Sequence, residues 1–132
     1  MVKAVTYILE NNVTIQGIVG LKSNGTEYKV YPVVVPQSEK EPFLVVRQAG
    51  KVPVGKGCDS FTYTIEVLCY TLSYDGVTTL ADAVVSALEG QSTATVNGVA
   101  FGFLNFFNEV DSFSADHGNL YVKLLTFEGV SD

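Results

Sequence analysis

The single histidine of the chain is the residue best suited to acid–base chemistry. His117 lies in the run Asp116-His117-Gly118-Asn119, and Asp111 is close by in the sequence. An imidazole beside carboxylates can act as a general base, because its proton exchanges near neutral pH. The same residue types are typical of a turn before a strand. We therefore expect His117 to be a turn residue rather than a catalytic one.

No other segment has the spacing that catalysis or cofactor binding requires. Val54-Gly55-Lys56-Gly57 surrounds a lysine with glycines, but it lacks the spacing and the following Ser or Thr of a phosphate-binding loop. One histidine without clustered carboxylates does not supply the ligands of a zinc site. Glu109, Asp111 and Asp116 are not spaced as in an EF-hand loop. We expect a protein that is not an enzyme and has no metal and no cofactor.

Cysteine usage and the start of the chain indicate a protein made in the cytoplasm. Cys58 and Cys69 do not form a C-x-x-C motif, and we expect both to be free thiols. Residues 1–6 lack the apolar core and cleavage site of a signal peptide. No apolar run reaches the length needed to span a membrane. We expect a soluble protein with no membrane partner.

Length and composition favour one folded domain over residues 1–132. The chain is 47% hydrophobic and only 17% charged, which is typical of a globular protein with a fairly apolar surface. A small protein of this kind often has part of its surface covered by a partner. The basic residues do not alternate with aromatic ones, so no nucleic-acid footprint is predicted.

The net charge of −6 is unevenly distributed along the chain. Residues 1–66 have a net charge of +1, whereas residues 67–132 contain Lys123 and eight acids. This division has two interpretations: ordinary solubilising charge, or opposite potentials that favour head-to-tail association of identical subunits. Under the second interpretation, the candidate interface residues are Arg47, Lys51, Lys56, Glu109, Asp111 and Asp116.

Hydrophobic periodicity predicts the elements that position these residues. Apolar and polar residues alternate strictly in 60–70, as in a half-buried strand, and a continuous apolar stripe predicts an amphipathic helix that Ser73 or Asp75 caps. Pro32 places its strand at an edge or a bulge. Gly and Lys indicate a loop in 49–58, and polar residues indicate a turn in 109–118. We expect helices over about 2–10 and 74–89, one helical turn within 13–19, and strands over 27–34, 42–48, 60–70 and 120–127.

These elements predict an α+β fold. A few-stranded, mostly antiparallel sheet is flanked by the N-terminal helix and the amphipathic helix. The phenylalanine-rich segment 101–107 has two interpretations, a buried strand or a surface that faces a neighbouring subunit. Periodicity alone does not separate them.

The order of these segments resembles the tail terminator, or tail-completion, family of long-tailed phages. The matching segments are the helix and turn of residues 2–19, Lys29-Val30-Tyr31-Pro32, Val35-Pro36-Gln37, Glu41-Pro42-Phe43-Leu44-Val45-Val46, and Leu80-Ala81-Asp82-Ala83-Val84 after the long strand. The chain departs from the family in its long 49–58 loop and its acidic second half.

The resemblance implies a structural protein of the virion neck or tail. Its subunits would form a ring, expected to be a hexamer, that caps the tail tube and joins it to the head-completion proteins. DNA would pass through the lumen without being read. The 49–58 loop would lie at a ring face or in the lumen, and the 109–118 turn at an exposed rim. The alternatives are another head–tail connector or portal adaptor, or a small ligand-binding or enzymatic domain centred on His117.

Overall fold

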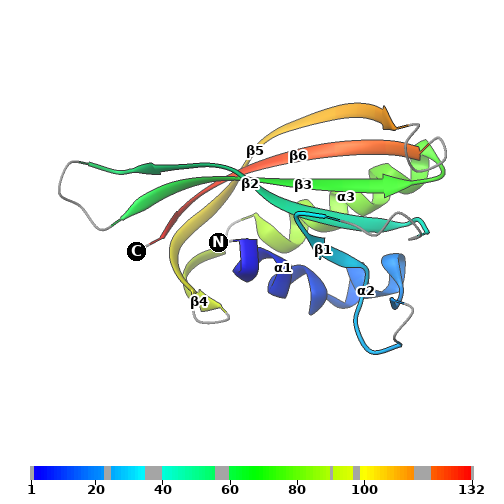
Figure 1. Cartoon of the computed structure of the whole chain (residues 1–132), viewed down its shortest axis with the longest axis horizontal. Helices are drawn as coiled ribbons and strands as arrows, with labels where there is room; N and C mark the ends of the chain where they lie inside the picture. The colour runs from blue at the N-terminus through cyan, green and yellow to red at the C-terminus, as the bar shows by residue number, and fades with distance from the viewer. Residues whose placement is uncertain are drawn as a thin grey trace.

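The computed structural model describes residues 2–22, 25–34, 40–55, 60–89, 91–96, 99–114 and 120–131. Within these residues, one twisted sheet carries helices on a single face (Figure 1). The elements are α1 (Val2–Glu10), α2 (Val13–Val19), β1 (Val30–Pro32), β2 (Phe43–Pro53), β3 (Phe61–Thr71), α3 (Tyr74–Leu88), β4 (Gln91–Val96), β5 (Val99–Ser114) and β6 (Leu120–Ser131). The α+β class and the mostly antiparallel sheet are confirmed.

The strand order is β1-β2-β3-β6-β5-β4, and only the β1–β2 pair is parallel. Pro32 lies in the edge strand β1, as predicted, where its missing N–H leaves no gap in the ladder. This strand is shorter than the predicted 27–34. It ends where Val33 adopts a φ of 68°, which a β-branched residue rarely adopts and which no strand can continue.

The two N-terminal helices are short, and asparagine and glycine cap the second of them. The predicted helix 2–10 is confirmed as α1, and the predicted turn within 13–19 is α2. Asn12 caps α2, because its side chain accepts a hydrogen bond from the Ile15 N–H at 3.1 Å. Gly20 ends α2 with a φ of 71°, which glycine adopts without a Cβ clash.

The main core lies between the helices and the sheet. The predicted alternation of β3 is confirmed, because Ile65, Val67 and Cys69 are fully buried against the helices. A second buried cluster lies on the opposite face of the sheet and contains Tyr31, Phe43, Val45 and Leu120. Apolar residues on both faces explain why β6 does not show a clean apolar–polar alternation.

Two predicted loops are strands in part. Residues 49–53 continue β2, which pairs with β3 as far as Pro53↔Phe61 after a bulge at Ala49. Residues 109–114 continue β5, which pairs with β6 as far as Ser114↔Leu120. Polar side chains are tolerated in both segments because they are exposed there. The strand β4 was not predicted.

The amphipathic helix is confirmed as α3, and Ser73 is its N-cap. The Ser73 hydroxyl accepts a hydrogen bond from the Gly76 N–H at 3.0 Å. A Cβ on Gly76 would lie 2.8 Å from this hydroxyl oxygen, so a larger residue at that position would displace the Ser73 side chain. Val77, Leu80 and Val84 then face the core.

Replacing Ser73 with Ala is expected to lower the free energy of unfolding by about 1 kcal/mol, because the free N–H groups of the first turn of α3 lose their acceptor. Chemical denaturation of the two proteins measures the difference. Ser73→Asp is the matched control and retains the acceptor. Equal losses in both variants would contradict the capping role.

Candidate functional site

A buried lysine near the start of β6 contacts side chains of two other elements. Lys123 is only 4% exposed, and register places it beside Asp111 of β5. Its Nζ lies 2.6 Å from Asp111 Oδ1 and 3.5 Å from Glu109 Oε2. It also lies 5.1 Å from the centre of the Tyr74 ring, and the Tyr74 hydroxyl donates a hydrogen bond to Asp111 Oδ2 at 3.0 Å. These contacts tie the start of α3 to β5 and β6.

The contacts shift the protonation of the pair toward its charged form. The hydrogen bond from Lys123, followed by that from Tyr74, lowers the pKa of Asp111. The hydrogen bond to Asp111 raises the pKa of Lys123 despite its burial. The pair is therefore ionised at neutral pH and acts as a fixed link. Because the pKa of Asp111 is lowered and that of Lys123 is raised, neither group exchanges its proton near neutral pH, as a general acid or base does.

Aromatic side chains surround this link and remain partly exposed. Phe113 contacts Tyr121 edge-on with ring centres 5.7 Å apart, and Tyr121 contacts Tyr74 at 6.1 Å. Phe113 is 57% exposed, Tyr74 48% and Tyr121 39%. The three rings line a hollow of about 310 Å³. Exposed aromatic clusters of this kind are typical of protein–protein interfaces.

The outer edge of β5 has no strand partner beyond Leu104. In the described part of the chain, β4 pairs with β5 only from Val99 to Leu104. Glu89, which follows the last residue of α3, accepts a hydrogen bond from the Phe106 N–H, and the Asn108 side chain accepts one from the Glu109 N–H. The edge from Val110 to Ser114 has no such cover among the described residues. Open strand edges invite pairing with another chain.

A register shift in β5 near Phe107 turns that ring outward. Phe106 packs on Phe127 of the core, whereas Phe107 is 65% exposed. A hollow of about 530 Å³ separates this part of β5 from α3, where Asp82 and Glu109 lie at its margins. We call the following residues the β5 edge surface: Tyr74, Asp82, Glu89, Phe107, Glu109, Val110, Asp111, Phe113 and Tyr121.

The second surface is the end of the β2–β3 hairpin, which extends past the helices (Figure 1). Arg47 Nε lies 2.6 Å from Glu66 Oε1. The Lys51 ammonium lies 4.1 Å from the centre of the Phe61 ring and 5.5 Å from that of Tyr63. We call the following residues the hairpin surface: Arg47, Lys51, Val52, Val54 and Phe61. Val52 is 61% exposed and Val54 is 56% exposed.

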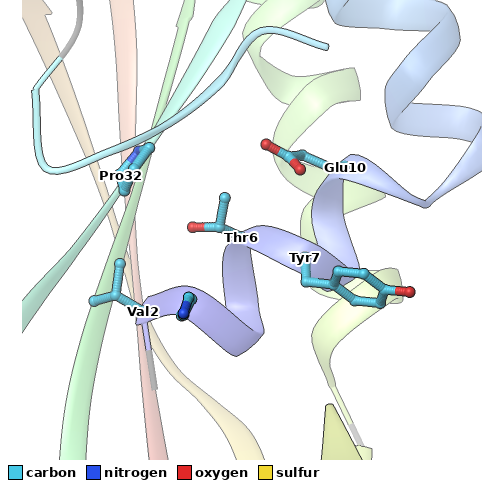
Figure 2. A pocket seen from close by; sticks show the side chains of 6 residues that line it. Val2, Thr6, Tyr7, Glu10 and Pro32 are labelled. Atoms are coloured by element: carbon cyan, nitrogen blue, oxygen red, sulfur yellow. The ribbon is translucent and has the colours of Figure 1, made fainter. Parts of the chain in front are cut away.

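A groove between α1 and the end of β1 is the third feature of the surface (Figure 2). Its volume is about 330 Å³, and its lining residues are Val2, Lys3, Thr6, Tyr7, Glu10 and Pro32. Figure 2 shows the Thr6 side chain turned toward Val2 and Pro32, whereas Tyr7 points away. The Thr6 hydroxyl is buried and has no hydrogen-bond partner among the residues that the structure describes. Partial burial raises the pKa of Glu10.

The structure separates the predicted interface residues into two groups. Arg47 and Lys51 lie on the hairpin surface, and Glu109 and Asp111 lie on the β5 edge surface. The strands β3 and β6 lie between the two groups. Lys56, Asp116, His117 and Cys58 lie outside the described residues. Sequence reasoning missed the roles of Lys123, Tyr74 and Tyr121, although a lone lysine within the apolar run 120–127 is a signal of a paired internal charge.

The described side chains of the phenylalanine-rich segment support both of its interpretations in part, a buried strand and an exposed surface. Phe106 contacts the core, and Phe107 faces outward.

Cys69 is a free thiol and is fully buried, and this burial raises its pKa. In the described residues, no group of three His, Cys, Asp or Glu side chains could hold a metal ion. Over the same residues, no helix is long and apolar enough to cross a membrane.

Comparison with known families identifies the chain. The family model described as tail completion protein gp17 matches residues 3–130. The chain belongs to this family. The resemblance inferred from the order of its segments is therefore confirmed, and the tail completion protein is a structural protein of the phage tail.

The fold of the tail completion protein is also present in a solved particle. A chain of the structure titled "Virion of native gene transfer agent (GTA) particle" matches with a TM-score of 0.68 and 18% sequence identity. The match covers 100% of this chain and 95% of the other. Comparison with curated proteins gives no match.

Replacing Asp111 with Asn is expected to destabilise the protein at neutral pH and to have no effect in strong acid. A carboxyl group whose pKa is lowered by folding adds stability above its unfolded pKa, near 3.8, and loses it as the pH falls through the lower folded value. Thermal unfolding from pH 7 to pH 2 measures the difference. A gap that persists at pH 2 would show that Asp111 does not act through its charge.

Replacing Thr6 with Val is expected to raise the free energy of unfolding of the isolated chain by about 1 kcal/mol, because it removes a buried hydroxyl that has no partner. Thr78→Val is the control, since its hydroxyl donates to the Tyr74 carbonyl oxygen at 3.0 Å. Differential scanning calorimetry compares the three proteins. A lower midpoint for Thr6→Val would mean that the hydroxyl is satisfied in solution.

Proposed function

We propose that this tail completion protein is a tail terminator. Its copies form a ring, expected to be a hexamer, that caps the tail tube and connects it to the head-completion proteins. The observation that carries the proposal is the family match over residues 3–130. The full-length likeness to a chain of a phage-like virion supports the same assignment.

The surface of the subunit suits a ring. A closed ring needs two different surfaces on each copy, so that one copy binds the next in a head-to-tail arrangement. The hairpin surface and the β5 edge surface differ in charge and lie on different strands of the sheet. Four of the predicted interface residues divide between these two regions, because Arg47 and Lys51 lie on the hairpin surface and Glu109 and Asp111 lie on the β5 edge surface.

The proposed role requires no catalysis. DNA passes through the ring without sequence readout, and the acidic second half of the chain is compatible with a lumen that does not retain phosphate groups. The ionised link between Lys123 and Asp111 supports a structural role for this region. The partners are other copies of the chain, the tail tube protein and a head-completion protein.

The proposal is tested by adding the purified protein to tail tube protein that is polymerising. The expected result is that tubes become capped at one end and stop growing at that end, as seen by negative-stain electron microscopy. Native mass spectrometry of the protein alone and with tubes gives the number of copies. A protein that stays monomeric and leaves tube growth unchanged would contradict the proposal. Binding to the portal or connector without binding to tubes would instead indicate a different neck component.

A further inference from the structure

We infer that the hairpin surface of one copy docks on the β5 edge surface of the next copy, with Lys51 against the carboxylates beside the open edge of β5. This inference rests on the proposed ring and names its contact. In each copy, the hairpin surface is the projecting part and the β5 edge surface is the receiving part.

The receiving part combines an open strand edge with exposed apolar rings. In an edge strand, every second residue directs its N–H and C=O away from the neighbouring strand. From Val110 to Ser114, no described strand or side chain covers that edge. Phe107 and Phe113 are more than half exposed next to it. Exposed rings and an uncovered edge are both removed from water when a second chain docks.

The projecting part is the end of the β2–β3 hairpin, which extends past the helices (Figure 1). Residues 47–53 of β2 are exposed or half-buried, although the first four residues of the same strand are buried. Val52 is therefore held in solvent within a regular strand, and Val54 is exposed just after the end of that strand. A hairpin that extends beyond its own core costs conformational entropy and buries little in return. Docking on a neighbouring copy would bury these side chains.

The two parts are complementary in charge. The β5 edge surface contains the carboxylates of Asp82, Glu89, Glu109 and Asp111, and the ammonium of Lys123 is buried beneath it. On the hairpin surface, Arg47 is paired with Glu66. Lys51 packs on Phe61 and has no carboxylate partner among the described residues. Opposite potentials of this kind direct one surface to the other and suppress contacts between like surfaces.

The strand order of the sheet prevents the hairpin surface from contacting the β5 edge surface of the same copy. The strands β3 and β6 separate β2 from β5, so the hairpin cannot reach the β5 edge of its own chain. A contact between different surfaces repeats from copy to copy, and it closes a ring when the rotation per copy divides a full turn.

Charge reversal tests the contact. Lys51→Glu and Asp82→Lys are each expected to raise the concentration at which rings form by about tenfold or more, because each places like charges together. The double variant is expected to restore rings to near the wild-type concentration. Mass photometry across a dilution series measures ring formation. Two single variants that form rings like the wild type, or a double variant that is worse than both, would overturn the inference.

Two further variants keep the test decisive. Val52→Asp changes a residue that is 61% exposed, so it leaves the fold intact and is expected to abolish rings. Lys3→Glu is the charge-matched control on the exposed side of α1 and is expected to leave rings unchanged. Loss of rings in Lys3→Glu alone would place the contact at the α1–β1 groove and overturn the inference. A wild-type protein that forms no rings either alone or on tail tubes refutes the proposed function itself, whereas wild-type rings that persist in all variants refute only this contact.

Discussion

The pairing of β3 with β6 at the centre of the sheet is the interaction on which the rest of the structure depends. It runs without a break from Phe61↔Ser131 to Thr71↔Tyr121. One face of this pair buries Ile65, Val67, Leu125 and Phe127 against the helices. The pair also holds β2 on one side and β5 on the other. The hairpin surface and the β5 edge surface therefore keep a fixed separation, which a head-to-tail assembly requires.

Lys123 links this central pair to the proposed interface. A buried ammonium is stable only with partners, and Asp111, Glu109 and the Tyr74 ring supply them. All three partners belong to the β5 edge surface. The core thus fixes the position of the acidic side chains that the neighbouring copy would contact. The aromatic rings around the same lysine supply the apolar area that gives such a contact its affinity.

Local patterns in the sequence predicted the elements that have strong periodicity. The alternation of β3, the apolar stripe of α3 and the edge position of Pro32 follow from side-chain spacing and backbone chemistry alone. The extension of β2 beyond Gln48 could not be predicted from these patterns. Gly50 and Lys51 are typical of loops, and they form a strand only because they pair with β3. For the same reason, the acidic residues 109–114 resemble a turn, whereas β6 recruits them into β5. The burial of Lys123 depends on residues 12 and 14 positions away, which periodicity does not reveal.

The central claim is that this protein ends the tail tube and connects it to the head. The most direct measurement is the position of the chain in intact particles, by electron microscopy of virions that carry a gold-labelled tag on it. The account predicts label only at the end of the tail that adjoins the head. Label along the length of the tube, at the distal tip or over the capsid shell would contradict it.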